Sequence, residues 1–267
     1  MEIILYSDFP EGDLKNLNNL GFPAKVIAGA KSLSEFKRVE SRIKESKNVT
    51  GVGYWPTLSR DEGYWISPWS NSDGLDRIFG QIEEREDKSQ MRVLLDLEPP
   101  YLVKKKQMLT GLRGFGKKKQ KIKQFIERAK QNNIQIVSAE LPRFVGSEYL
   151  QRLCGIAYDP NEIDYEKVKM AYTSLMTQFG IPRNQARQLL EREARIGHEL
   201  FGNKFGIGLG CTAKSGLKLD ERILTPQELR EDLEIIQNEG IEKAYIYSLR
   251  GLTPDYAEVL AGFTSSP

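Results

Sequence analysis

The chain has 267 residues, of which 39% are hydrophobic and 28% charged, and its 39 Lys and Arg against 37 Asp and Glu leave a net charge of +2. This composition is typical of a globular domain and excludes a disordered chain, and the charge does not indicate a nucleic-acid partner. No stretch approaches the roughly 20 apolar residues of a membrane span, and Met1 to Tyr6 is patterned as a strand rather than a signal peptide. We therefore expect a cytoplasmic protein with no membrane partner.

Residue types that commonly carry metal or nucleophilic chemistry are scarce. His198 is the only histidine and lies in a helical pattern, while Cys154 and Cys211 lie in apolar runs without CxxC spacing. We interpret His198 as structural and both cysteines as buried free thiols. The sequence accordingly predicts no resident metal and no cofactor.

Apolar runs of strand length recur eight times with helical patterns between them. This alternation predicts a parallel α/β fold, and eight such units predict a single (β/α)8 TIM barrel domain over residues 1–267. The strands are expected, in chain order, at Ile3–Tyr6, Lys25–Ala28, Val49–Tyr54, Val93–Glu98, Ile134–Ala139, Cys154–Pro160, Phe205–Thr212 and Ala244–Leu249.

Helix signals fill the intervals between these runs. Ser32 with Glu35 and Thr225 with Glu228 have capping-box spacing, which predicts that helices begin there. A short helix is expected at 13–20, and an apolar stripe around Leu75 predicts the third. Two helical patterns at 168–179 and 186–194 predict a longer helical crossover between strands six and seven. In strand seven, alternate glycines at 206, 208 and 210 leave space on one face.

The fourth strand ends in two acids followed by two prolines. Side chains alternate along a strand, so Asp96 and Glu98 share one face. They lie at the carboxyl end, where parallel barrels keep their chemistry. Acids at this position are also common as partners of Lys or Arg, so a purely structural role stays open at this point.

A barrel brings its strand ends together, and the residues there suit a carbohydrate. Aromatic rings stack on the apolar faces of sugars, and paired carboxylates supply acid catalysis of glycosidic cleavage. An acid beside a second acid in a partly dry pocket has a raised pKa, so Glu98 is the candidate proton donor and Asp96 the charge that tunes it. The remaining candidates at strand ends are Glu140, Asp159, Tyr54, Trp55, Tyr158, Tyr247 and Arg250.

These motifs resemble the family 18 glycoside hydrolases, the chitinases and endo-β-N-acetylglucosaminidases. Asp96-Leu97-Glu98 is similar to the Asp-x-Glu that ends their fourth strand, and Tyr158-Asp159 to the Tyr-Asp that ends their sixth. Residues 53–55 and 244–249 resemble the ends of their third and eighth strands, with Tyr247 where the family usually has Trp. The chain departs from the family at Leu94, where a further Asp is usual.

The resemblance implies substrate-assisted retaining hydrolysis of N-acetylhexosamine-containing oligosaccharides, an exception to the two-carboxylate mechanism. Glu98 would protonate the leaving oxygen while the substrate's acetamide carbonyl attacks the anomeric carbon. Asp96 would orient the acetamide and Tyr158 would bind its carbonyl oxygen. Substrate binding would fall to Asp159, Glu140, Tyr54, Trp55, Tyr247 and Arg250.

Three other interpretations remain open. A metal-dependent sugar isomerase or aldolase-like barrel would use Asp96, Glu98, Glu140 and Asp159 as oxygen ligands. A chitinase-like barrel could bind glycan without hydrolysing it. A two-glutamate retaining glycosidase is disfavoured because strand seven offers no carboxylate. The basic stretch 104–123 could contact an anionic glycan, although a solvated loop that runs into the fourth helix is the favoured explanation of its composition.

Overall fold

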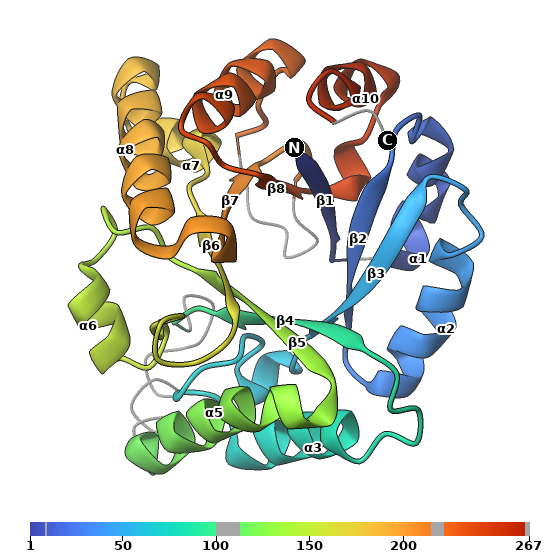
Figure 1. Ribbon diagram of the computed structural model, residues 1–267, viewed down its shortest axis with the longest axis vertical. Coiled ribbons are helices and arrows are strands. Elements are labelled where there is room, and N and C mark those ends of the chain that lie inside the picture. The colour runs from blue at the N-terminus through green and yellow to red at the C-terminus, as the bar shows by residue number, and fades with distance from the viewer. Residues whose placement is uncertain (9, 100–112, 215–221, 265–267) are drawn as a thin grey trace. The chain divides into compact units, whose positions relative to one another are not determined.

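The computed structural model describes residues 1–8, 10–99, 113–214 and 222–264. Its eight strands form one closed, parallel sheet in the order β1 to β8, with helices between strands (Figure 1). The predicted (β/α)8 barrel is therefore confirmed. The strands are β1 Glu2–Ser7, β2 Ala24–Ala30, β3 Val49–Pro56, β4 Met91–Leu97, β5 Ile134–Glu140, β6 Glu166–Met170, β7 Phe205–Gly210 and β8 Lys243–Tyr247.

The helices begin close to where the sequence signals lie. Glu35 accepts the backbone N–H of Lys31 and donates its own N–H to Ser32 Oγ, and Thr225 and Glu228 form a full capping box. The predicted longer crossover between strands six and seven is confirmed as two helices, α7 and α8. The α-helices are α1 Pro10–Asp13, α2 Leu33–Ile43, α3 Ser72–Glu83, α5 Phe115–Ala129, α6 Glu148–Leu153, α7 Thr173–Gln178, α8 Arg183–Phe201, α9 Pro226–Asn238 and α10 Pro254–Ala261.

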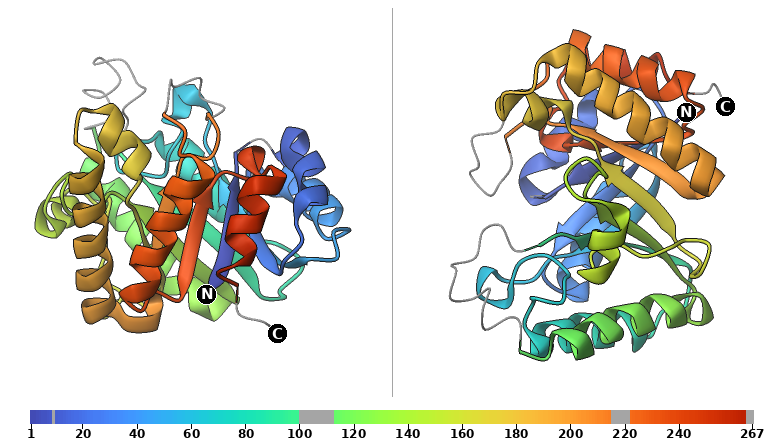
Figure 2. Two further views of the ribbon diagram at one scale, coloured as in Figure 1. Left: turned by 90° about the horizontal axis from the view of Figure 1, so that it is seen from above. Right: turned by 90° about the vertical axis from the view of Figure 1, so that its left-hand side faces the viewer.

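The chain divides into two compact units. The first unit comprises Met1–Gly29, Arg38–Gly53 and Val168–Pro267, and the second comprises Ala30–Lys37 and Tyr54–Lys167. In the first unit, α9 packs beside both α8 and α10 (Figure 2). In the second, β4 and β5 lie side by side, and the rings of Phe79 on α3 and Phe125 on α5 stack with centroids 4.1 Å apart.

The glycine row of β7 is filled by tyrosines within the first unit. A Cβ on Gly206 would lie 2.8 Å from the ring of Tyr245, and one on Gly208 would lie 3.3 Å from the ring of Tyr172. The first of these distances is too short for a real Cβ contact, so the position requires glycine. The predicted space on this face is therefore present, and aromatic side chains of the same unit occupy it.

The predicted sixth strand is wrong. Residues 154–165 form turns, in which Gly155 has a positive φ of 65° and Ile163 N–H donates to Asp159 O, and β6 follows only at Glu166. Residues 168–170, expected to begin a helix, belong to this strand. The sequence pattern misses this strand because it contains Lys167 and Lys169. Both lysines are 0% exposed, whereas a sequence pattern assigns lysines to solvent.

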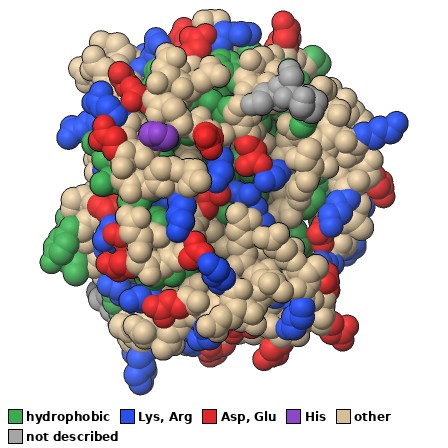
Figure 3. All heavy atoms as spheres, in the orientation of Figure 1, with side chains coloured by type: hydrophobic (Ala, Val, Ile, Leu, Met, Phe, Trp, Pro, Cys, Tyr) green, Lys and Arg blue, Asp and Glu red, His purple; other side chains and the backbone are tan. Residues whose placement is uncertain are grey.

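No helix among the described residues is long and apolar enough to cross a membrane. Both cysteines are free thiols, as predicted, and Cys211 is buried, but the predicted burial of Cys154 is wrong because its side chain is half-buried. His198 lies exposed on α8. The face seen in Figure 3 carries acidic and basic side chains interspersed, without a single-sign field.

Candidate functional site

The acid pair at the end of β4 lies in the second unit. Asp96 is 4% exposed and Glu98 is half-buried, and the two side chains are hydrogen-bonded to each other. Two residues apart on an extended chain, they project to the same side, as the sequence predicts. The pair is thus a buried carboxyl–carboxyl contact that can share a proton.

Burial is the main influence on the pair's acidity. It raises the pKa of Glu98 from its ordinary 4.5 to about 7, with the hydrogen bond to Asp96 opposing the rise. The pKa of Asp96 is raised well above its ordinary 3.8 by burial, by the nearby Glu98 charge and by their shared hydrogen bond. Two carboxyls this close cannot both ionise near neutral pH, so the pair keeps a proton there.

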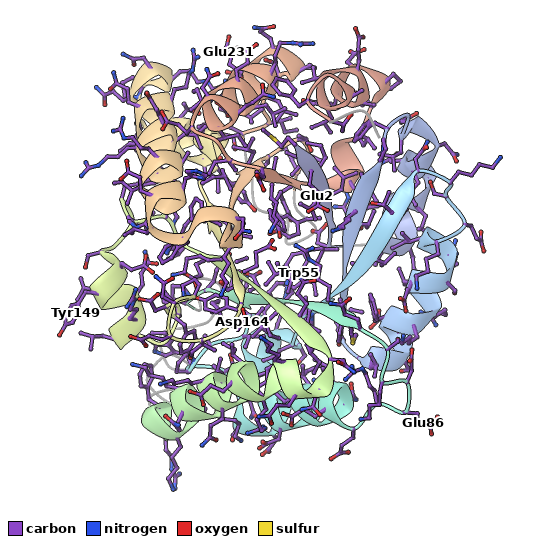
Figure 4. The ribbon with its side chains drawn as sticks, viewed as in Figure 1. Glu2, Trp55, Glu86, Tyr149, Asp164 and Glu231 are labelled. Atoms are coloured by element: carbon purple, nitrogen blue, oxygen red, sulfur yellow. The ribbon has the colours of Figure 1, made fainter. Side chains whose placement is uncertain are left out.

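Trp55, the penultimate residue of β3, is the second polar contact of Asp96. Its side chain is 7% exposed, and its hydrogen bond to the Asp96 carboxyl opposes, as the smallest of the causes, the rise in the pKa of that group. Figure 4 shows Trp55 among interior side chains, whereas Glu86 of the same unit lies at the periphery. Among the described residues, Asp96 Oδ1 has no hydrogen-bond partner although it is buried. This oxygen is therefore a buried acceptor whose partner does not lie among the described residues.

The aromatic connection after β3 is anchored beside the pair. Ile66 N–H donates to the carbonyl oxygen of Asp96 at 3.0 Å, and Ser70 Oγ donates to Trp65 O at 2.7 Å. Lys118 on α5, only 6% exposed, donates to Ser70 O at 3.0 Å, and burial lowers its pKa. These hydrogen bonds hold the connection in place beside the end of β4.

The raised pKa of Glu98 predicts a specific pH dependence of stability. A group that binds its proton more tightly when folded stabilises the fold below its unfolded pKa and loses that contribution as pH rises through its folded pKa. We expect the free energy of unfolding to fall by about 1–3 kcal/mol between pH 4.5 and 7 through Glu98. Denaturant titrations of the wild type and Glu98→Gln at pH 5 and pH 8 measure it.

The variant should lose less stability than the wild type across this window, because its amide does not ionise. Glu86→Gln, an exposed change in the same unit, is the matched control and should follow the wild type. Parallel losses in the wild type and Glu98→Gln would contradict the assignment of the titration to Glu98.

Glu140 lies on the other face of the sheet from Asp96. In the β4–β5 register Asp96 is opposite Ala139, whereas Glu140 is opposite Leu97, and residues opposite each other share a face. Glu140 is fully buried and accepts from Ser138 Oγ at 2.8 Å and Tyr165 OH at 3.2 Å. Its Oε2 lies 3.1 Å from Lys167 Nζ. The structure does not bring Glu140 together with the acid pair.

Tyr158 and Asp159 lie in the turn segment before β6, not at a strand end. Tyr158 OH donates to Lys119 O at 3.4 Å, and burial, aided by the Glu140 charge, raises its pKa. Asp159 is ion-paired with Arg152 at 2.8 Å. The part of the resemblance that set Tyr-Asp at the end of strand six is therefore wrong for these residues.

Tyr54 faces away from the acid pair. Its ring stacks on Phe36 of α2 with centroids 4.8 Å apart, and the side chain is 0% exposed. Adjacent residues of a strand point to opposite faces, so Trp55 approaches Asp96 while Tyr54 packs under the helix. Tyr54 therefore belongs to the hydrophobic core, and Trp55 belongs to the candidate site.

The first unit has its own polar cluster at the carboxyl ends of β1 and β8. Tyr247 OH donates to Asp8 Oδ2 at 3.0 Å, and Arg250 forms ion pairs with Asp8 at 3.6 Å and Asp13 at 3.1 Å. Tyr247 and Arg250, the two candidates at the end of strand eight, thus belong to one group that is joined by a hydrogen bond and ion pairs. Reasoning from sequence missed Asp8, which follows β1 as one isolated acid and gives no pattern signal.

Tyr172 is the second residue missed. It follows β6 and its half-buried ring stacks on that of Tyr247, with centroids 6.0 Å apart. Tyr172-Thr173 therefore occupies the position after strand six at which the resemblance expects Tyr-Asp. The sequence contains this tyrosine, but the apolar periodicity of residues 168–179 predicts a helix there and so hides the strand end.

The remaining expectations concern metals and the basic stretch. No group of three or more His, Cys, Asp or Glu suited to a metal occurs within the described parts of the chain. Lys104, Lys105 and Lys106 lie outside the described residues. Of the later basic residues, Lys121 pairs with Asp76 and Lys123 with Glu127, as expected of a solvated helix face.

The sequence matches no family model, and no curated protein matches it. Solved structures with the same fold include 3-keto-D-glucoside 4-epimerase from E. coli, with a TM-score of 0.53 and 14% identity over 98% of both chains. The spore cortex-lytic enzyme of Bacillus megaterium has a TM-score of 0.55 and 12% identity over 98% of this chain and 74% of its own. The catalytic domain of beta-amylase from Paenibacillus polymyxa has a TM-score of 0.54 and 10% identity over 98% and 96%. At such identities the likeness establishes the barrel fold alone.

Proposed function

We propose that the protein is a sugar-acting barrel that hydrolyses glycosides of N-acetylhexosamines, with Glu98 as the general acid. The observation that carries the proposal is the buried Asp96–Glu98 pair at the carboxyl end of β4, in which the pKa of Glu98 is about 7. A general acid works best when its pKa lies near the working pH. One barrel neighbour, the 3-keto-D-glucoside 4-epimerase, has a sugar derivative in its name and is consistent with this class.

In the proposed reaction the proton on Glu98 passes to the glycosidic oxygen as the bond to the anomeric carbon breaks. The substrate's own acetamide carbonyl attacks that carbon, and water later opens the resulting ring with Glu98 as base. Asp96 orients the acetamide, and its unpartnered Oδ1 is a suitable acceptor for the acetamide N–H. This role follows from the resemblance of the Asp96-Leu97-Glu98 motif.

The proposal is tested by release of a chromophore from N-acetylglucosamine oligosaccharides and from matched glucosides that lack the acetamide. We expect turnover of the N-acetyl series alone, because the attacking group belongs to the substrate. Turnover should be unchanged by a chelator. Equal turnover of both series would exclude the substrate-assisted route, and no turnover of any member by folded protein would exclude the hydrolase.

A sugar epimerase is the second candidate, favoured by the fold likeness to the 3-keto-D-glucoside 4-epimerase. It predicts a change of sugar configuration without cleavage, and dependence on an added divalent cation if Asp96 and Glu98 serve as ligands. Non-catalytic glycan binding predicts neither product. The same incubations, analysed for epimerised sugar and for bound oligosaccharide, separate these three outcomes. A cytoplasmic location remains part of the proposal, with oligosaccharides rather than a polymer as substrates.

A further inference from the structure

Helix α6 and the loop before it expose apolar side chains to solvent. Eight large hydrophobic side chains are exposed in the described parts of the chain, and five of them lie within residues 144–153. We call these five the α6 patch, which consists of Phe144, Val145, Tyr149, Leu150 and Leu153. Figure 3 shows hydrophobic side chains on the left, where Figure 4 labels Tyr149. A surface helix normally buries its apolar side, so the orientation of α6 is inverted.

Polar side chains hold α6 and its loop on the second unit. Gln151, only 3% exposed, donates through Nε2 to Pro142 O at 3.1 Å and to Gly146 O at 2.6 Å. On the same helix, Glu148 pairs with the buried Lys167 at 2.5 Å. Because these bonds fix the helix and the loop, the patch is already ordered, and little conformational entropy is lost when it binds.

The charges beside the patch are paired within the chain. Arg143 lies 3.7 Å from Glu148, Arg152 lies 2.8 Å from Asp159, and Lys119 donates to a backbone carbonyl at the end of α6. Membrane-surface helices use Lys and Arg to bind anionic lipids, and a highly charged protein partner is matched by charge of one sign. A paired rim suits neither, whereas it does not repel an identical surface. The net charge of +2 adds little repulsion between two copies.

The size of the patch is appropriate for a contact between two copies. Its side chains are 36–70% exposed, which corresponds to roughly 500 Å² in total if a whole large side chain has about 150–250 Å². Two such patches that meet would bury about 1,000 Å² of mainly apolar surface, and the polar rim would bring the contact toward the roughly 1,600 Å² of a stable interface.

We propose that the α6 patch is the contact surface of a homodimer in which two copies meet about a two-fold axis. In such a contact the same patch of both copies is buried, so the apolar side chains of one copy face those of the other. Removal of Tyr149 and Leu150 from water supplies the driving force. The inference does not rest on the proposed function, because no side chain of the patch belongs to the Asp96–Glu98 pair.

The experiment is sedimentation equilibrium of the full chain from about 1 to 100 μM, a range that covers a dimer of micromolar Kd. It compares the wild type with Leu150→Glu, which places a charge in the proposed contact. Leu200→Glu is the matched control, because Leu200 on α8 of the first unit is 53% exposed against 56% for Leu150 and receives the same charge. Tyr149→Ser removes the aromatic ring without adding a charge. Thermal melts of dilute samples check that each variant is folded.

We expect a dimeric wild type, a Kd raised at least roughly tenfold in Leu150→Glu and in Tyr149→Ser, and a Kd within about twofold of the wild type in Leu200→Glu. A wild type that stays monomeric over the whole range would overturn the inference. So would a dimer that Leu150→Glu and Leu200→Glu weaken equally, or that neither weakens. Binding of a monomeric wild type to phosphatidylcholine vesicles, abolished by Leu150→Glu, would assign the patch to a lipid surface instead.

Discussion

Glu98→Gln is expected to lower kcat for N-acetylglucosamine glycosides by roughly 10²- to 10⁴-fold, the usual contribution of general acid catalysis. The amide keeps the shape of the side chain and removes the acidic proton at the end of β4. The measurement is the initial rate of chromophore release at saturating substrate, with folding of the variant checked by its thermal melt.

The leaving group separates acid catalysis from a general loss of the site. A dinitrophenyl glycoside needs no protonation on departure, so Glu98→Gln should lose far less rate on it than on an oligosaccharide. Glu86→Gln, exposed at the periphery of the same unit, should match the wild type on both substrates. Equal losses of Glu98→Gln on both substrates would argue against a proton donor, and wild-type rates would remove Glu98 from the chemistry.

Lys167→Met is expected to destabilise the protein by about 3–5 kcal/mol, the range observed when one partner of a buried ion pair is removed. Lys167 and Glu140 are both 0% exposed and lie 3.1 Å apart, and Lys167 also binds Glu148. The Met side chain fills similar volume but leaves the Glu140 charge buried without its cation. Urea unfolding of the wild type and variant measures the loss.

A double variant and a surface control sharpen this test. Lys167→Met with Glu140→Gln should recover part of the loss, because residue 140 then carries no buried charge that lacks a cation. Lys130→Met removes a lysine that is 78% exposed and pairs with Asp164, and it should leave the unfolding midpoint nearly unchanged. A loss in Lys167→Met no greater than that in Lys130→Met would show that the buried pair contributes little.

The Glu140 pair also shows why acids at neighbouring strand ends do not all meet. Asp96 and Glu98 meet because residues two apart on an extended chain project to the same side, which local geometry alone decides. Whether Glu140 joins them depends on the register between β4 and β5, and that register places it opposite Leu97. A one-residue difference in pairing changes the face, and no pattern within either segment specifies it.

The sequence by itself determined the alternation of strands and helices, the helix starts after Ser32 and Thr225, and the acid pair, because each depends on periodicity or spacing within a few residues. Only the tertiary structure decided the position of β6, where Lys167 is buried by acids from β5 and α6. It likewise decided the contact of Trp55 with Asp96. The physical reason is common to both. A polar group is buried only when a partner satisfies it, and here the partner is distant in sequence, so the pattern of a single segment cannot identify it.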